Sequence, residues 1–293
     1  MTRQTLSYLR NLFEQRGIRP KNKLGQNFLI DLNLLDVLLN AAELTRSDLA
    51  LEIGSGTGSL TARLAELAGV VLSVELEPAF YHLTGEAVAG RANVVLLHAD
   101  ILHGKNVLNP RVLEALEETR QRFACARLKL VANLPYAVAT PVISNLLLSD
   151  LPIERMIATV QWEIAERLTA RPGNKDYGAL AVLVQSVAEV EIVRRLPPTV
   201  FWPRPKVDSA IVCIRPNATK RAVIGDVFRL RVFLRDLYTH RRKNLRGALT
   251  GWPTGRRDKE EVDRKLEHLG IEGTVRAEDL DLEQHRRLCE VFG

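Results

Sequence analysis

Short apolar runs separated by helix-length spacers recur through the first two thirds of the chain. Each run has five or six residues rich in Val, Ile and Leu, a pattern typical of strands buried on both faces of a parallel sheet. Spacers such as 59–68 and 79–89 have the apolar spacing of helices. This alternation predicts a doubly wound α/β domain. The runs are Leu49–Ile53, Val70–Glu75, Asn93–Leu97, Leu128–Ala132 and Met156–Gln161.

The pattern changes after residue 190. Two further strand-like runs, Val190–Leu196 and Asp208–Ile214, are joined by a proline-rich connection without a helix. They predict an antiparallel pair at the edge of the sheet, where proline is tolerated. Beyond residue 216 the sequence is helical in period and strongly charged, over 226–249 and again from 258 and 278. We therefore expect two domains, 1–216 and a small helical domain 217–293.

Composition excludes several classes of protein. Of 293 residues, 46% are hydrophobic, enough for a large core, and no apolar run approaches the roughly 20 residues that span a bilayer. The three cysteines lack metal-ligand spacing and fit a reducing compartment, so we expect neither a metal site nor a disulfide framework. The Arg-rich N-terminus has no signal-peptide core. A transit peptide, as in a mitochondrial relative, stays open, but a cytoplasmic protein is favoured.

The formal charge is only +6, but it is unevenly distributed. Residues 215–257 hold twelve basic and two acidic side chains, a local charge of +10, whereas the other 250 residues sum to −4. Such a run is often a solvated helical surface, and it also fits a polyanionic partner. The basic residues are Arg215, Lys220, Arg221, Arg229, Arg231, Arg235, Arg241, Arg242, Lys243, Arg246, Arg256 and Arg257.

A glycine motif follows the first apolar run, within Glu52-Ile53-Gly54-Ser55-Gly56-Thr57-Gly58. Its GxGxG spacing differs from the GxGxxG of dinucleotide-binding proteins. The next two runs end in acids, Glu75 and Asp100, and the carboxyl ends of parallel strands share one edge of the sheet. Glu75 suits a bidentate grip on ribose hydroxyls.

Three acids around one glycine loop favour a cationic nucleoside without phosphate over a pyrophosphate. S-adenosylmethionine, with its sulfonium and α-ammonium groups, is such a ligand. A glycine turn that merely starts a helix would explain the GxGxG alone equally well, because short glycine motifs often match by chance. The alternative interpretation of this site is an enzyme that binds a nicotinamide dinucleotide.

The fourth apolar run ends in an unusual tetrapeptide, Asn133-Leu134-Pro135-Tyr136. Methylation of an exocyclic amine, whose lone pair is delocalised into the ring, would use such groups. The Asn133 oxygen and a backbone carbonyl fixed by Pro135 can accept hydrogen bonds from the amino group and make its nitrogen more nucleophilic. Tyr136 can stack on a base taken out of its own stack. A proline turn with a half-buried tyrosine is the alternative, and the motif's place on the same sheet edge favours the site.

Ordered motifs over residues 24–246 resemble the small-subunit (16S) ribosomal RNA adenine N6,N6-dimethyltransferase family. The resemblance implies a Rossmann-like methyltransferase sheet, S-adenosyl-L-methionine as the methyl donor, and methylation of two adjacent adenines in a 16S rRNA hairpin during ribosome biogenesis. The motifs are Leu24-Gly25-Gln26-Asn27-Phe28-Leu29, 52–58, Val74-Glu75, Asp100, 133–136, 160–168, 176–178, 201–209 and 241–245.

The resemblance also assigns roles to residues. On the cofactor, Gln26, Asn27 and Leu29 would cross the methionine end, Gly54 and Gly56 would line the loop, Glu75 would hold the ribose, and Asp100 the adenine amino group. Asn133 would contact both the cofactor and the target N6, and Leu134 or Pro135 would supply the carbonyl. Tyr136 and Phe201 would sandwich the target adenine, although Phe201 also fits an apolar plug in a proline loop.

The basic segment is then expected to contact rRNA phosphates. Arg241, Arg242, Lys243 and Arg246 are the predicted RNA-binding residues, on two successive helices together with the arginines at 229, 231 and 235. The partner would be 16S rRNA within the small ribosomal subunit or its precursor. The enzyme would act as a monomer, and no membrane partner is expected.

Two other functions stay open. One is a 23S rRNA adenine N6-methyltransferase of the antibiotic-resistance type, which the extended helical domain and the 201–209 motif disfavour. The other is a non-catalytic ribosome assembly factor, which the intact Asp100 and 133–136 disfavour. The chain departs from the family pattern at Ala132, where glycine is common, and in segment 109–127, which is expected to be a charged helical insertion.

Overall fold

The computed structural model describes residues 5–20, 25–105 and 107–293, and its chain divides into two compact units. The first comprises 1–165 and 191–215, and the second comprises 166–190 and 216–293. The predicted domain boundary, after residue 216, lies one residue from the boundary between the units at 215/216. Segment 166–190, which the sequence placed with the first domain, instead groups with the C-terminal helices, because its helix packs with helices beyond residue 226.

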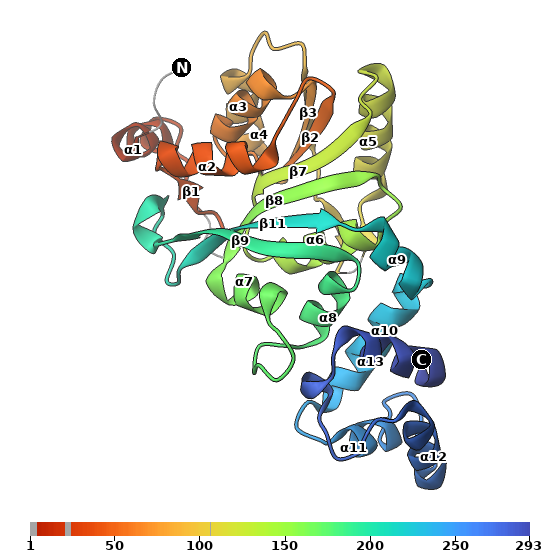
Figure 1. Ribbon diagram of the computed structural model, residues 1–293. Coiled ribbons are helices and arrows are strands. Elements are labelled where there is room, and N and C mark those ends of the chain that lie inside the picture. The colour runs from red at the N-terminus through yellow and green to blue at the C-terminus, as the bar shows by residue number, and fades with distance from the viewer. Residues whose placement is uncertain (1–4, 21–24, 106) are drawn as a thin grey trace. The chain divides into compact units, whose positions relative to one another are not determined.

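A seven-stranded sheet carries the predicted site (Figure 1), and its strand order is β4-β3-β2-β7-β8-β11-β9. The first five strands in this order run parallel, and β11 runs antiparallel to β8. All seven predicted runs are strands. Their bounds are β2 Asp48–Ile53, β3 Val70–Glu75, β4 Val94–His98, β7 Arg127–Asn133, β8 Ile153–Gln161, β9 Ala188–Leu196 and β11 Ser209–Pro216.

The strand order reverses between β2 and β7. From β2 the chain moves outward through β3 to β4, and it then returns to pair β7 with the other side of β2. At such a switch point the loops after the two strands diverge and leave a crevice at their carboxyl ends. The glycine motif follows β2 and the Asn133 tetrapeptide follows β7, so the fold brings both motifs to this crevice.

Helices cover both faces of the sheet, with α2 and α3 on one side and α5 on the other (Figure 1). Helix α5 is the crossover from β4 to β7, and it buries Val112 and Leu116 against the sheet. Segment 109–127 is therefore mainly helical as predicted, and its helix is the crossover that a parallel sheet requires. That the segment is an insertion relative to the family stays a prediction. The helices are α2 Leu32–Ala42, α3 Ser59–Leu67, α4 Pro78–Ala87, α5 Pro110–Arg122, α6 Ala139–Leu148 and α7 Trp162–Thr169.

Three small elements surround the carboxyl edge of the sheet. Helix α1 (Leu6–Gln15) packs Phe13 against Phe28 and Phe80, with ring centroids 5.3 and 5.7 Å apart. Strand β1 (Phe28–Leu29) pairs antiparallel with β10 (Phe201–Trp202), which follows the 3-10 helix η2 (Pro198–Val200). A hairpin of β5 (Leu102–Gly104) and β6 (Val107–Leu108) follows β4.

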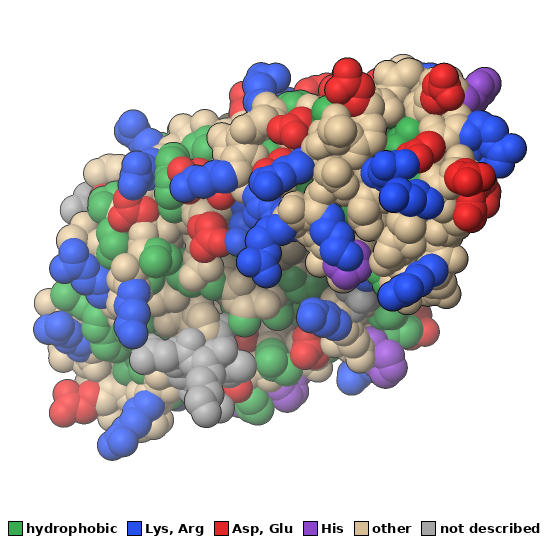
Figure 2. Space-filling view, turned by 90° about the horizontal axis from the view of Figure 1, so that it is seen from below, with side chains coloured by type: hydrophobic (Ala, Val, Ile, Leu, Met, Phe, Trp, Pro, Cys, Tyr) green, Lys and Arg blue, Asp and Glu red, His purple; other side chains and the backbone are tan. Residues whose placement is uncertain are grey.

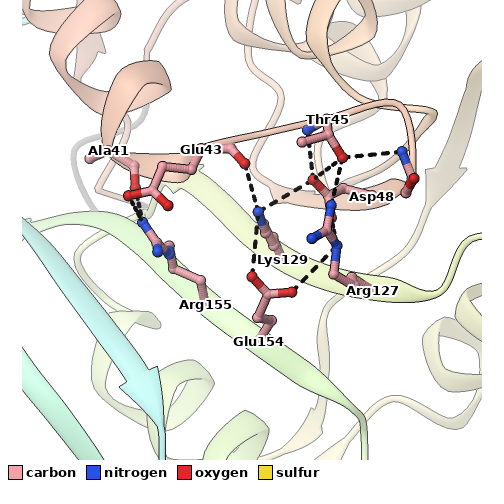
Figure 3. Close-up of polar contacts among 9 residues, drawn as sticks. Ala41, Glu43, Thr45, Asp48, Arg127, Lys129, Glu154 and Arg155 are labelled. Carbon is pink, nitrogen blue, oxygen red and sulfur yellow. Dashed lines mark hydrogen bonds and ion pairs between the residues drawn. The ribbon is translucent and has the colours of Figure 1, made fainter.

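A charged network closes the amino edge of the sheet (Figure 3). Lys129 and Asp48, 2% and 0% exposed, form an ion pair of 3.3 Å, and Lys129 also donates to the Glu43 carbonyl at 2.7 Å. Arg155 donates to the Ala41 carbonyl at 2.9 Å. Cations from β7 and β8 thus satisfy carbonyls at the C-terminus of α2, which have no partner within the helix. The network fixes α2 against the strands that carry the site.

The second unit is helical, as predicted. The expected helical stretch over 226–249 is divided, because Asn244 caps a new helix by accepting from the Gly247 N–H at 2.9 Å. Within the described residues, no helix has the length and apolar character needed to cross a membrane. The helices are α8 Ala179–Gln185, α9 Ala218–Ile224, α10 Val227–Leu237, η3 Tyr238–His240, α11 Leu245–Thr250, α12 Lys259–Leu269, η4 Ala277–Asp279 and α13 Leu282–Phe292.

Candidate active site

The glycine loop has a backbone that only glycine adopts easily. Gly54 and Gly56 have φ of +80° and +58°, in the left-handed region. A Cβ on Gly56 would lie 2.8 Å from the Phe28 ring, and a Cβ on Gly54 would lie 3.1 Å from Pro135. The loop is therefore packed directly on the Asn133 tetrapeptide and on the β1 segment, and the glycines are needed for that close approach.

Glu75 is buried at the end of β3 and is oriented by the backbone of the loop. Its carboxylate accepts from the Gly56 N–H at 3.0 Å and from the Glu77 N–H at 2.9 Å. The Ser55 hydroxyl lies 3.4 Å from the same oxygen that accepts from Gly56. These contacts hold a carboxylate at the cavity wall, where it can accept from ligand hydroxyls.

Glu52 is a second buried acid behind the glycine loop, and the sequence reading assigned it no separate role. The Thr61 and Ser73 hydroxyls donate to its Oε2 at 2.6 and 2.5 Å. Its Oε1 has no hydrogen-bond partner among the described residues. Burial raises the pKa of Glu52 to about 7, the two hydroxyl donors lower it, and the nearby Glu75 charge raises it. The cavity wall therefore contains an acid that changes charge near neutral pH.

Asp100 is exposed and lies two residues after the end of β4. Its Oδ1 accepts from the Leu102 N–H at 2.9 Å, and its backbone carbonyl accepts from the Asn109 side chain at 2.8 Å. Ile101, the next residue, is buried and also lines the cavity. Asp100 thus presents a fixed carboxylate at the rim, next to an apolar wall.

The Asn133 side chain is oriented by a residue 106 positions earlier in the chain. Its Nδ2 donates to the Asn27 carbonyl at 2.8 Å, which leaves Oδ1 as the group that can accept a hydrogen bond from a ligand. The Pro135 carbonyl already accepts from the Val138 N–H at 3.0 Å. Within the described part of the chain nothing donates to the Leu134 carbonyl, so Leu134 is the better candidate for the second acceptor.

Tyr136 is half-buried and fixed at its hydroxyl. The hydroxyl lies 2.5 Å from Ser209 Oγ at the start of β11. Burial raises the pKa of Tyr136, so the phenol stays neutral at physiological pH. Tyr136 follows Pro135 in the sequence, but unlike Pro135 it is not part of the cavity wall. Its predicted stacking on a target base stays a prediction.

The N-terminal motif lies across the same crevice. Gln26, Asn27 and Leu29 line the cavity, and Gly25 approaches the tetrapeptide so closely that a Cβ would lie 2.8 Å from the Tyr136 nitrogen. Gly25 also has φ of +66°, so both its backbone conformation and this close approach require glycine. Leu24, the first residue of the motif, lies outside the described residues.

One cavity therefore collects most of the predicted site residues from five separate stretches of sequence. Leu76 and Ile101 directly follow the acids Glu75 and Asp100 in the sequence. They also line the cavity and were not identified from the sequence, and their position next to those acids is the signal that could have found them. The predicted residues in the wall are Gln26, Asn27, Leu29, Gly54, Gly56, Glu75, Asp100, Asn133 and Pro135.

Phe201 has the other role that the sequence left open. Its side chain is 2% exposed and packs in the apolar core with Leu196 and Ile211, and it is absent from the cavity wall. Its backbone is held against Leu29 by the β1–β10 pairing. A base could stack on this ring only if the ring left the core. In this structure Phe201 is an apolar plug beneath the N-terminal motif, and its predicted stacking on the target adenine stays a prediction.

Of the predicted RNA-binding residues, Arg241, Arg242 and Lys243 are exposed and Arg246 is half-buried, and they differ in charge environment. Arg241 pairs with Glu278 at 3.0 Å and Arg246 pairs with Asp263. Over the described ranges, no acidic side chain pairs with Arg242 or Lys243. The residues at 241–243 lie in the turn between η3 and α11, not on a helix as expected, because Asn244 starts α11.

The excess charge of the basic segment is partly neutralised by acids that are distant in sequence. Lys220 pairs with Glu189 at 2.7 Å, and Arg215 pairs with Glu191 at 2.6 Å. On the face drawn in Figure 2, Lys and Arg side chains are spread widely, with Asp and Glu side chains among them. The local charge of +10 in the sequence therefore overstates the charge available to a polyanion.

No group of three His, Cys, Asp or Glu side chains in the described residues is arranged to hold a metal ion. The three cysteines are free and buried.

Comparison with known proteins identifies the family of this chain. The family described as ribosomal RNA adenine dimethylase matches residues 17–292. The ribosomal RNA small subunit methyltransferase A of Pelotomaculum thermopropionicum is 40% identical over 290 residues, which cover 97% of this chain and 95% of that protein.

Two solved structures share the fold. A dimethyladenosine transferase from Plasmodium falciparum has a TM-score of 0.72 at 24% identity, over 89% of this chain and 95% of that one. The 23S rRNA methyltransferase ErmE has a TM-score of 0.61 at 27% identity, over 90% of this chain and 99% of that one. The family match over nearly the whole chain and the 40% identity lead to one conclusion: the chain belongs to the ribosomal RNA adenine dimethylase family.

Proposed function

We propose that the protein transfers methyl groups from S-adenosyl-L-methionine to N6 of two adjacent adenines in small-subunit (16S) ribosomal RNA, as a step of rRNA processing in ribosome biogenesis. One observation carries the proposal: the Asn133 side chain is held with its oxygen as the available acceptor, in the same cavity as the Glu75-bound glycine loop. The name of the 40% identical relative supports the choice of the small subunit.

The cavity suits this cofactor by the chemistry of its groups. Glu75 can accept from the ribose hydroxyls, and Asp100 can accept from the adenine amino group. The glycine loop leaves room where Cβ atoms would stand, and the acids Glu75 and Asp100 favour a cation. Bound there, the cofactor supplies an electrophilic methyl group on its sulfonium.

The residues of the chain then prepare the target nitrogen. Asn133 Oδ1 and the Leu134 carbonyl would accept the two N6 hydrogens of adenine and favour the nucleophilic form of the nitrogen. Neither group is a strong base, so the amine proton leaves to solvent after the transfer. The hydrogen bond from Asn133 to Asn27 preorganises the acceptor, which is the main way in which such sites lower a barrier. Tyr136 would stack on the extruded base.

RNA binding is assigned to the exposed cations. Arg242 and Lys243, which have no acidic partner in the described residues, would contact phosphates first. Arg241 and Arg246 would have to exchange their partners Glu278 and Asp263 for phosphates, which costs little because exposed ion pairs contribute about 0–1 kcal/mol. We further propose that the enzyme acts as a cytoplasmic monomer on the small subunit or its precursor.

The second candidate function is methylation of large-subunit rRNA. It is favoured by the fold that the chain shares with ErmE, at 27% identity. The higher identity to a small-subunit enzyme supports the first candidate.

Methyl transfer to isolated subunits separates the two functions. Unmethylated small and large subunits are incubated with labelled cofactor, and the products are mapped by mass spectrometry. We expect two dimethylated adenines in small-subunit rRNA. Transfer only to large-subunit rRNA would select the second candidate, and transfer to neither would favour a non-catalytic assembly factor.

Replacement of Asn133 by alanine tests the mechanism. Asn133→Ala should abolish turnover because it removes the acceptor, while RNA binding stays nearly unchanged because the cations are untouched. Asn33→Ala, an exposed asparagine on α2, is the control and should keep full activity. A parallel loss of RNA binding in Asn133→Ala would argue against a catalytic role.

A further inference from the structure

Asn109 makes three hydrogen bonds at the root of the β5–β6 hairpin. Its Oδ1 accepts from the Arg111 N–H at 3.0 Å, which caps helix α5. Its Nδ2 donates to the Asp100 carbonyl at 2.8 Å. Its backbone N–H donates to the Ile101 carbonyl at 2.9 Å. One residue therefore joins the start of the crossover helix to Asp100 and Ile101, in the loop after β4.

Those two residues belong to the cavity wall. Asp100 and Ile101 both line it, and the Asp100 carboxylate is further held by the Leu102 N–H at 2.9 Å. The backbone of Asp100 is thus fixed by Asn109 and its side chain by Leu102. In the described part of the chain no contact involves Asp100 Oδ2, so that oxygen is available to a ligand.

Helix α5 provides a rigid base for this contact. It buries Val112, Leu116 and Thr119 and packs against β3 and β4. Because Asn109 is its N-cap, the side chain that reaches Asp100 starts from a fixed point of the sheet layer. A loop residue without this cap would hold Asp100 less firmly.

We propose that Asn109 is a positioning residue that fixes the Asp100 carboxylate for recognition of the adenine amino group of the cofactor. The inference rests on the proposed function, since Asp100 reads adenine only if the nucleoside cofactor binds in this cavity. It gives segment 109–127 a role in cofactor specificity through its first residue.

The side chain of asparagine is what allows both contacts. The carboxylate of aspartate would cap α5 equally well, since Asn and Asp are similar N-caps. It could not donate to the Asp100 carbonyl, and its oxygen would face that carbonyl at 2.8 Å. Asn109→Asp therefore separates capping of the helix from positioning of Asp100. Asn109→Ala removes both.

The experiment measures binding of two ligands by calorimetry. S-adenosyl-L-homocysteine carries the adenine amino group, whereas S-inosyl-L-homocysteine carries an oxygen there and would face the Asp100 carboxylate with an acceptor. The dissociation constant of S-inosyl-L-homocysteine divided by that of S-adenosyl-L-homocysteine is the ratio that measures recognition of the amino group. It is determined for the parent protein, Asn109→Asp, Asn109→Ala and Asp100→Ala, with thermal unfolding of each variant.

We expect both Asn109 variants to reduce the ratio about 5- to 10-fold, the equivalent of one hydrogen bond. Only Asn109→Ala should lower the melting temperature through loss of the cap. Asn217→Ala is the matched control, because Asn217 caps α9 by the same contact, at 2.9 Å to the Lys220 N–H, and has no contact with the cavity. It should keep the parent ratio.

A parent-like ratio in Asn109→Asp, with a reduced ratio in Asp100→Ala, would overturn the positioning role and leave the proposed function intact. A parent-like ratio in Asp100→Ala would show that Asp100 does not read adenine, and would overturn this assignment of the cofactor site as well.

Discussion

Replacement of Glu52 by glutamine should reduce the loss of folding stability that occurs as pH rises from 5 to 8. Glu52 is completely buried at the end of β2, and burial raises the pKa of its carboxyl to about 7 from an ordinary value of 4.5. The folded state thus favours the protonated acid. Between pH 4.5 and 7 the unfolded chain releases this proton and the folded protein does not, so stability falls as pH rises.

The magnitude follows from the two pKa values. Linkage between 4.5 and about 7 makes the cost about 1 kcal/mol at pH 5 and about 3 kcal/mol at pH 8. Glutamine keeps an oxygen for the hydroxyl donors and carries no charge, and any cost of its amide is the same at both pH values. The stability of Glu52→Gln relative to the parent should therefore improve by about 2–3 kcal/mol from pH 5 to pH 8.

Calorimetric unfolding of both proteins from pH 5 to pH 8 provides the assay. For a unit of this size the change corresponds to roughly 5–10 °C in the difference between the melting temperatures. Ser73→Ala is a second test, because the Ser73 hydroxyl lowers the pKa of Glu52 and its loss should extend the pH dependence to higher pH. A difference in melting temperature that does not change with pH would refute the argument that burial keeps Glu52 protonated.

Three other variants test separate parts of the structure. Gly56→Ala should lower cofactor affinity at least tenfold in calorimetry, because its Cβ meets the Phe28 ring at 2.8 Å and its left-handed backbone costs alanine about 1–2 kcal/mol; wild-type affinity would contradict this. Arg242→Gln with Lys243→Gln should reduce the slope of log affinity for rRNA against log salt by about 1.4–1.8, measured by filter binding; an unchanged slope would exclude both from phosphate contact. Lys129→Met should lower the free energy of unfolding by about 3 kcal/mol in urea titrations, because it leaves the buried Asp48 carboxylate without its lysine; a loss below 1 kcal/mol would show that Arg127, which donates to Asp48 Oδ1 at 2.7 Å, is a sufficient partner.

Most of the sheet could be predicted from sequence because its central strands are buried on both faces. Every residue of β2 and β3 is buried, so the strands appear in the sequence as continuous apolar runs with sharp ends. The site followed from the same fact, since parallel strands bring Glu75, Asp100 and Asn133 to one edge. Here local pattern and tertiary structure agree.

Contacts between distant residues could not be predicted. The acids that pair with Lys220 and Arg241 are Glu189 and Glu278, so a local sum of charge missed them. The burial of Phe201 could not be predicted either, because an aromatic residue in a proline loop has the same local sequence whether it faces a ligand or the core. The roles of Glu52 and Asn109 depend on burial and on the conformation of a hairpin, neither of which a motif encodes.

The pairing of β1 with β10 has a consequence for synthesis of the protein. Phe28 is paired with Trp202, so the N-terminal segment of the cavity has its partner strand only after another 174 residues have been translated. At about 5–20 residues per second this takes roughly 10–35 s. The sheet from β2 to β7 can form earlier, whereas the segment that carries Gln26 and Asn27 must wait. In a nascent chain this part of the catalytic edge is therefore completed after the strands from β2 to β7, although its first strand is made before them.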